Sequence, residues 1–147
     1  MLRMTDSLAN RQWHEIDALN EQAWQICDSD LPRSRALAEK AQALSPSYAL
    51  GLAASLRTLG YLNMRLGNHP LGLTQLLEAL ELCETNRLTA TLPDVLDGIA
   101  GSYFQIGDLP TALDYMHRQL AAAEQIGDAQ LIANAYNNLA GLYLQTG

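Results

Sequence analysis

The chain has 147 residues, of which 48% are hydrophobic, so it is long enough for one domain with a sizeable core. Nine Lys and Arg residues stand against 16 Asp and Glu residues, which gives a formal net charge of −7. This charge repels nucleic acids and anionic membrane surfaces, and we therefore expect neither as a partner.

The residues that commonly bind metals are scattered along the chain. Cys27 and Cys83 lack CxxC spacing and lie in apolar helical patterns, which predicts two buried, reduced thiols. His14, His69 and His117 do not have the spacing of a metal site, so we expect no metal and no cofactor. The first residues lack the apolar core of a signal peptide, and no stretch reaches the ~18 apolar residues of a membrane span. These features predict a cytoplasmic protein.

The first predicted helix covers residues about 10–27, where apolar side chains recur every three or four residues. These side chains are Trp13, Ile16, Leu19, Ala23 and Ile26. Asp30 is a good N-cap and Pro32 suits a first turn, which predicts a second helix to about residue 44. Its expected packed side consists of Ala36, Leu37, Lys40, Ala41 and Leu44.

Five more helices follow, at about 47–66, 68–85, 93–106, 108–126 and 128–146. Gly67 and Gly107 fit left-handed C-terminal caps. Asn68, Asp108 and Asp128 fit N-caps. The joins are short, so successive helices are expected to be antiparallel neighbours.

A period of forty residues runs through the chain. Gly60 corresponds to Ala100 and Ala140, and Gly67 corresponds to Gly107 and Gly147. A fixed period of this size is typical of a repeat array, in which each unit buries its apolar face against its neighbours. Glycine costs about 1 kcal/mol relative to alanine inside a helix, so Gly60 and Gly72 suggest a helix crossing too close for a methyl group.

The segments LGYLNMRLGNHPLGLTQLLEAL and IAGSYFQIGDLPTALDYM resemble the tetratricopeptide repeat. YNNLAGLYLQTG is similar to kinesin light chain repeats, and EQAWQICDSDLPRSRALAEKAQAL resembles the first repeat of regulatory regions preceding bacterial diguanylate cyclase, adenylate cyclase or sensor kinase domains. The resemblance implies an all-α, right-handed solenoid of seven helices in one domain. Its repeats would cover residues about 10–45, 47–85 and 92–126, with a half repeat at 128–147. The first repeat lacks the glycine before its second helix, and Gln119 replaces an expected small residue.

In this family the first helix of each pair lines a concave, partner-binding surface. By phase, the resemblance implies a groove formed by Trp24, Arg57, Tyr61, Met64, Arg65, Asp97, Phe104, Asn134, Asn137 and Asn138. Further lining positions are Asp17, Asn20, Asp94, Gly101, Gln105, Gly141 and Gln145. Aromatic, Met, Arg and Asn side chains have the composition of a protein-recognition surface. Alternatively, the three aromatic residues pack sideways across repeats and the asparagines are solvated without a role.

No stretch of the sequence has a nucleophile elbow, a phosphate-binding glycine loop or a metal-spaced cluster, and we expect no enzyme. Asp28, Asp30, Asp94 and Asp97 are interpreted as caps and solvated faces.

Two functions are consistent with the sequence. The first is a protein-interaction and regulatory module in the N-terminal region of a bacterial signalling protein, with Arg57 and Arg65 as a positive spot for acidic ligands. The second is an oligomerisation scaffold that dimerises a downstream enzyme domain. The position of Gly147 in the period predicts a fragment that ends within its fourth repeat. Its last helix would then expose an apolar face, drawn from Tyr136, Leu139, Ala140 and Tyr143, that makes an intermolecular contact, either in a dimer or in a crystal contact that stands in for the missing helix.

Overall fold

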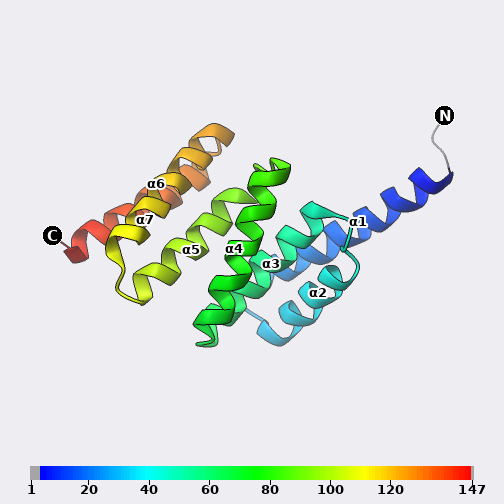
Figure 1. Ribbon diagram of the computed structural model, residues 1–147, viewed down its shortest axis with the longest axis horizontal. Coiled ribbons are helices and arrows are strands. Elements are labelled where there is room, and N and C mark those ends of the chain that lie inside the picture. The colour runs from blue at the N-terminus through cyan, green and yellow to red at the C-terminus, as the bar shows by residue number, and fades with distance from the viewer. Residues whose placement is uncertain (1–3, 147) are drawn as a thin grey trace.

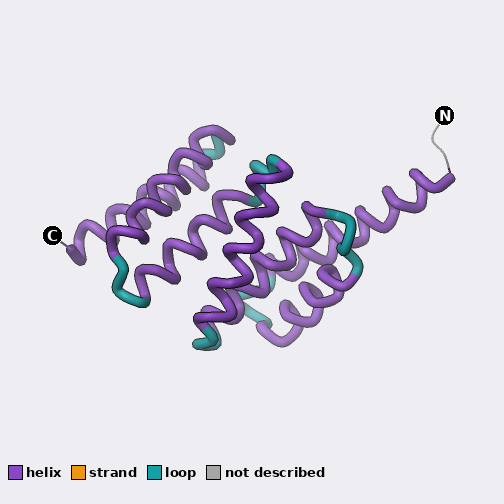
Figure 2. Tube along the Cα trace, in the orientation of Figure 1, coloured by secondary structure: helices purple, strands orange, loops and turns teal. Residues whose placement is uncertain are grey.

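The computed structural model describes residues 4–146, and all seven regular elements in this range are α-helices (Figures 1 and 2). They are α1 (Met4–Gln25), α2 (Leu31–Ala43), α3 (Ala49–Arg65), α4 (His69–Asn86), α5 (Leu92–Gln105), α6 (Leu109–Ile126) and α7 (Ala129–Thr146). The predicted all-α class with seven helices is confirmed for this part of the chain. Gly147, on which the predicted end of the period depends, lies outside the described residues, as do the first three residues of the segment considered for a signal peptide.

The helix ends follow from local residue types. Asp30 and Asp108 each accept a hydrogen bond from the backbone N–H three residues on, at 3.2 Å in both cases. Gly67 and Gly107 share a φ of 83°, in the left-handed region that glycine adopts without a steric penalty. Asn68 occupies the predicted N-cap position of α4, but its side chain makes no capping hydrogen bond. The positions of these turns were thus predictable.

The helix α1 begins at Met4, about six residues earlier than predicted. Residues 4–25 contain no glycine or proline to interrupt a helix, so it continues toward the N-terminus beyond the part that packs. Its first turns stand clear of the other helices in Figure 1. Ile16 and Ala23 are buried as expected, whereas Trp13 is exposed and stacks on Tyr48 with 4.9 Å between the ring centroids.

The predicted packed side of α2 is wrong in part. Ala36 and Lys40 are exposed, and the buried face consists of Ser34, Ala38 and Ala41. The Ser34 hydroxyl donates a hydrogen bond to the Ala23 carbonyl oxygen of α1 at 2.7 Å, which satisfies a polar group inside the contact. These small residues let α2 approach its neighbours closely. A search for large apolar side chains does not identify such a face.

Each helix packs against the next one along the chain. In addition α1 contacts α3 and α3 contacts α5, whereas α2, α4 and α6 make no comparable contacts with one another among the described residues. The first helices of successive pairs therefore gather on one side. A buried cluster joins α3, α4 and α5 and extends to Ala122 of α6, and its large side chains include Leu56, Leu76, Leu96 and Ile99.

The crossing of α3 and α4 depends on two glycines. A Cβ atom on Gly72 would lie 2.9 Å from the Gly60 carbonyl oxygen and 2.9 Å from atoms of Met64. A Cβ atom on Gly60 would lie 2.7 Å from Cγ of Leu76. The backbones of the two helices are thus in direct contact, and the close crossing predicted from these glycines is confirmed.

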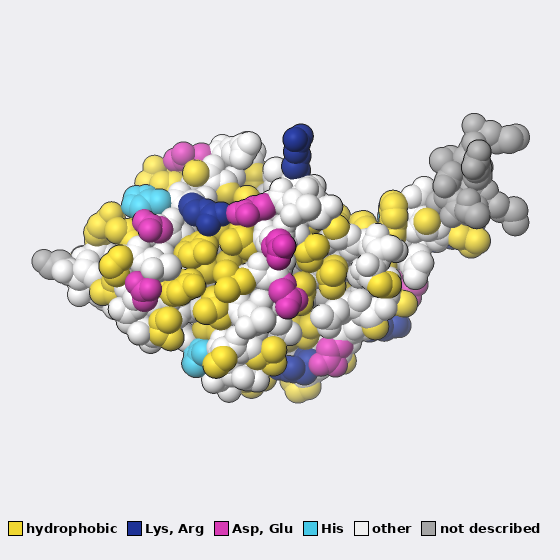
Figure 3. All heavy atoms as spheres, viewed as in Figure 1, with side chains coloured by type: hydrophobic (Ala, Val, Ile, Leu, Met, Phe, Trp, Pro, Cys, Tyr) yellow, Lys and Arg dark blue, Asp and Glu magenta, His cyan; other side chains and the backbone are white. Residues whose placement is uncertain are grey.

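The face seen in Figure 3 carries α4 and α6 in front, and hydrophobic side chains reach the surface across its middle. Tyr103 of α5 stacks on Tyr115 of α6, with 5.6 Å between the ring centroids. Arg118 of α6 pairs with Glu84 of α4 at 2.6 Å and joins these two helices. This exposed ion pair contributes little stability, about 1 kcal/mol or less.

Candidate partner-binding cavity

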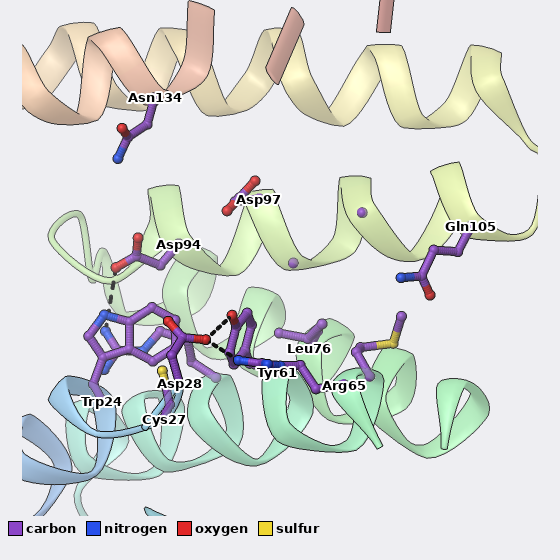
Figure 4. A pocket seen from close by; sticks show the side chains of 14 residues that line it. Trp24, Cys27, Asp28, Tyr61, Arg65, Leu76, Asp94, Asp97, Gln105 and Asn134 are labelled. Carbon is purple, nitrogen blue, oxygen red and sulfur yellow. Dashed lines mark hydrogen bonds and ion pairs between the residues drawn. The ribbon is translucent and has the colours of Figure 1, made fainter. Parts of the chain in front are cut away.

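A cavity of about 500 Å³ opens on the side where the first helices gather (Figure 4). Side chains from the end of α1, the turn after it, α3, α5 and α7 line this cavity, together with Leu76 of α4. Of the ten residues predicted to form the groove, it brings together Trp24, Arg57, Tyr61, Met64, Arg65, Asp97 and Asn134. Asp94, Gly101 and Gln105 from the wider set also line it.

The other three predicted residues are not among those that line the cavity. Asn138 borders the cavity, because its Nδ2 donates a hydrogen bond to Oδ1 of Asp97 at 2.7 Å. Phe104 packs against the cluster around Met116 and is not among the lining residues, as the alternative interpretation of the aromatic residues expects. Asn137 is exposed to solvent away from the lining.

Four residues of the wider set do not line the cavity. Asn20 is only 3% exposed, and its Nδ2 donates a hydrogen bond to the Gly51 carbonyl oxygen at 3.0 Å, so it belongs to the packing of α1 on α3. Asp17 accepts a hydrogen bond from the Tyr48 hydroxyl, and it lies outside the lining with Gly141 and Gln145. The resemblance implied helices that do contribute to the cavity, but it did not determine which way each of these side chains faces.

Arg57 is held between an aromatic ring and a carboxylate. Its guanidinium lies over the Trp24 ring, 4.2 Å from the centroid, and 3.7 Å from Oδ2 of Asp94. The side chain is only 11% exposed. Burial lowers the pKa of Arg57 and raises the pKa of Asp94, while the charge of each residue acts in the opposite direction on the other. The positive charge of Arg57 is therefore compensated within the cavity wall.

Arg65 is compensated as well, by a residue that the sequence did not indicate. Asp28, in the turn after α1, pairs with Arg65 and accepts a hydrogen bond from the Tyr61 hydroxyl at 2.7 Å (Figure 4). Burial, and then the hydrogen bond to Asp28, raise the pKa of Tyr61 to about 12. Tyr61 also meets the Trp24 ring edge to face, at 5.6 Å between centroids. The sequence offered one sign that Asp28 could reach the cavity, namely its position just after a helix expected to line the groove.

The expected positive spot of Arg57 and Arg65 is therefore absent. Both residues line the cavity, but each has a carboxylate partner from another element of the chain. The interpretation of Asp94 as a solvated face is wrong for the same reason, since it forms an ion pair inside the cavity. The interpretation of Asp30 as a helix cap is confirmed.

Asp97 differs from the other two carboxylates of the cavity. Desolvation by the surrounding protein raises its pKa most, the nearby charge of Asp94 raises it further, and the hydrogen bond from Asn138 lowers it. Solvent still reaches the carboxylate through the open side of the cavity. Among the described residues, no Lys, Arg or His forms an ion pair with it.

Both cysteines are buried free thiols, as predicted. Burial raises the pKa of Cys27, which lines the cavity, and raises the pKa of Cys83 to about 11. Within residues 4–146 no cluster of His, Cys, Asp and Glu side chains is arranged to hold a metal ion. Over the same range, none of the helices combines the length and apolar character needed to cross a membrane.

Comparison with protein-family models gives no match, and comparison with curated proteins gives none either.

Proposed function

We propose that this chain is a non-catalytic protein-interaction module that holds an extended segment of a partner protein in the cavity bounded by α3, α5 and α7. One observation carries the proposal: a cavity of about 500 Å³ is lined from three successive helix pairs and from α7 by aromatic, charged and amide side chains. Such a composition suits recognition of a polypeptide, because the aromatic rings supply contact area and the amides pair with a peptide backbone.

Preorganised contacts support this role. Arg57 lies over the Trp24 ring and pairs with Asp94. Asp28 pairs with Arg65 and accepts a hydrogen bond from Tyr61. Side chains fixed in this way lose little conformational entropy when a partner binds, which favours affinity. Asn134 and Gln105 reach the cavity from α7 and α5 and offer amide donors and acceptors.

We further propose that the chain is a single right-handed solenoid of the tetratricopeptide type, with the repeat boundaries expected from its period. Equal φ angles at Gly67 and Gly107, forty residues apart, and the contacts of α3 with both α1 and α5 support this architecture. The resemblance of the sequence to bacterial regulatory regions supports a cytoplasmic signalling role, in which partner binding controls a cyclase or kinase output domain.

The cavity can be blocked at Gly101, and the chain offers a matched control at Gly141. A Cβ atom at either helical glycine meets no atom within 4 Å, but only Gly101 lines the cavity. Peptides selected on the wild-type protein from a random displayed library are expected to lose at least about tenfold in affinity for Gly101→Trp, a loss of about 1.4 kcal/mol, and none for Gly141→Trp. Calorimetric titration measures both. Equal affinity for wild type and Gly101→Trp would show that the cavity is not the binding site.

A second function, as an oligomerisation scaffold, is favoured by the surface of α7. This helix contains no Asp, Glu, Lys or Arg, and Tyr136, Tyr143 and Leu144 on it are 54%, 53% and 85% exposed. Ala140 is exposed beside them, whereas Leu139 is buried against α6, so the apolar face includes Leu144 in place of the predicted Leu139. A second copy of the chain is the proposed occupant, because two molecules of charge −7 repel each other least through an uncharged face.

Sedimentation equilibrium tests the scaffold. We expect the wild-type protein to dimerise and Leu144→Glu to shift it toward the monomer, since a charge would then enter an apolar contact. The control is Leu66→Glu, which changes an exposed leucine at the end of α3. A wild-type protein that remains monomeric at its highest soluble concentration would exclude this function.

A further inference from the structure

The charges of the cavity do not balance. Three carboxylates, those of Asp28, Asp94 and Asp97, face the two guanidinium groups of Arg57 and Arg65. Asp28 pairs with Arg65, and Asp94 lies 3.7 Å from Arg57. The cavity is therefore left with one uncompensated charge, which is negative and located at Asp97.

The surroundings of Asp97 stabilise its charge only weakly. Among the described residues, its hydrogen-bond donor is the neutral amide of Asn138 at 2.7 Å, and Asp94 lies one helical turn before it on the same face of α5. Figure 4 shows Asp97 and Asn134 on the two sides of the space between α5 and α7, away from the paired groups of α3. The Asn134 Oδ1 atom accepts a hydrogen bond from Gln130 and has a second lone pair.

These groups discriminate between classes of ligand. An acidic ligand finds both guanidinium groups already paired and is repelled by Asp97. A neutral segment that fills the cavity removes water from Asp97 and supplies no counter-ion, which is costly for a carboxylate. A cationic group supplies the missing charge and donates to the oxygens of Asp97 and Asn134. At longer range, the net charge of −7 attracts a basic partner.

We propose that the partner segment bound in this cavity carries a basic side chain, lysine or arginine, whose cationic group sits against Asp97 between α5 and α7. This inference rests on the proposed function of the cavity and specifies the chemistry of its partner. It replaces the acidic ligand expected from the two arginines of α3.

Two peptides that differ only in charge test the proposal. The probes are acetyl-Gly-Gly-Arg-Gly-Gly-amide and the analogue with citrulline, which keeps the shape and hydrogen-bond donors of arginine without its charge. Titration of each peptide into the isotopically labelled protein is followed through the backbone amide signals of Gly98 and Gly101, both of which line the cavity. We expect the arginine peptide to bind about five- to tenfold more tightly than the citrulline peptide, with a smaller difference at high salt.

Two variants test whether Asp97 is the source of the charge preference. Asp97→Asn keeps an acceptor for Asn138 and removes the charge, so the difference between the peptides is expected to disappear. Glu81→Gln removes an exposed charge on α4, outside this cavity, and is expected to leave the difference unchanged. A carboxyl carbon titration gives an independent readout, because a bound cation lowers the pKa of Asp97.

The outcomes separate the inference from the proposed function. Equal binding of the two peptides, with both shifting Gly98 and Gly101, refutes the basic partner and leaves the cavity as a peptide site. Failure of the arginine peptide to shift these signals at its highest soluble concentration refutes the inference, while the peptides selected from a random library test the cavity separately. A preference for arginine that persists in Asp97→Asn also refutes it.

Discussion

Replacing Gly72 with alanine tests the central packing contact of the protein. Alanine stabilises a helix by about 1 kcal/mol relative to glycine, so the substitution would strengthen α4 if no neighbour interfered. The new Cβ atom, however, lies 2.9 Å from the Gly60 carbonyl oxygen and 2.9 Å from Cγ and Sδ of Met64. Met64 can change rotamer, but the carbonyl oxygen moves only with the backbone of α3. Overpacking of this kind costs about 1–3 kcal/mol, and the two helices must separate along their crossing.

We therefore expect Gly72→Ala to lower the free energy of unfolding by about 1–2 kcal/mol, which corresponds to about 5 °C in Tm for a chain of this length. Gly101→Ala is the matched control, because its Cβ atom meets nothing within 4 Å, and it should stabilise the protein by about 1 kcal/mol. Urea unfolding followed by far-ultraviolet circular dichroism measures both, and an unchanged m value indicates that the variants unfold over the same surface. A Gly72→Ala protein as stable as wild type would refute the backbone contact between α3 and α4.

Three further predictions concern titratable groups. The pKa of Asp97 is raised in the folded state, so its ionised form destabilises the fold at neutral pH and this penalty disappears as the pH falls through the folded pKa. Asp97→Asn should accordingly be more stable than wild type at pH 7, with the difference narrowing in acid; a difference that widens in acid denaturation curves would contradict the assignment. Burial, and then the hydrogen bond to Asp28, raise the pKa of Tyr61 from 10 to about 12, so the neutral phenol contributes stability that is fully present below pH 10 and is lost between pH 10 and about 12. Tyr61→Phe should be less stable than wild type below pH 10, and the difference should narrow between pH 10 and about 12. Alkaline denaturation curves of the two proteins that stay parallel over this range would count against this contribution. Cys27 and Cys83 are buried with raised thiol pKa values, so both should react with Ellman's reagent only at the rate of unfolding, and rapid labelling of the native protein at pH 8 would show that they are accessible.

Local features of the fold were predictable because each depends on residues close together in the chain. Asp30 and Asp108 cap the helices that follow them, and Gly67 and Gly107 adopt the left-handed conformation that ends the helices before them. The glycine pair Gly60 and Gly72 was a longer-range signal, and it was readable because glycine inside a helix requires a reason. The same logic failed for Asn68, whose side chain leaves its cap position unused.

The extent of packing was harder to predict. The start of α1 at Met4 shows that the absence of a helix breaker allows a helix to extend past its packed part, which a hydrophobic pattern does not reveal. On α2, Ser34 is buried with its hydroxyl bonded to the backbone of α1, whereas Lys40 is exposed. A buried polar residue with a backbone partner has no distinct signature in the sequence.

The sequence by itself determined the helices and most of their boundaries, because helix formation and capping are local properties, whereas the resemblance to a repeat family implied which helices would line a groove. Only the tertiary structure decided the electrostatics of the cavity. Arg65 meets Asp28 across 37 positions of the chain, and Arg57 meets Asp94 in another helix pair. Coulomb interactions act through space and are strengthened where protein displaces water, so a carboxylate distant in sequence can neutralise an arginine. For that reason two apparent anion-binding residues became part of the cavity wall, and Asp97, which the sequence placed among solvated carboxylates, was left as its uncompensated charge.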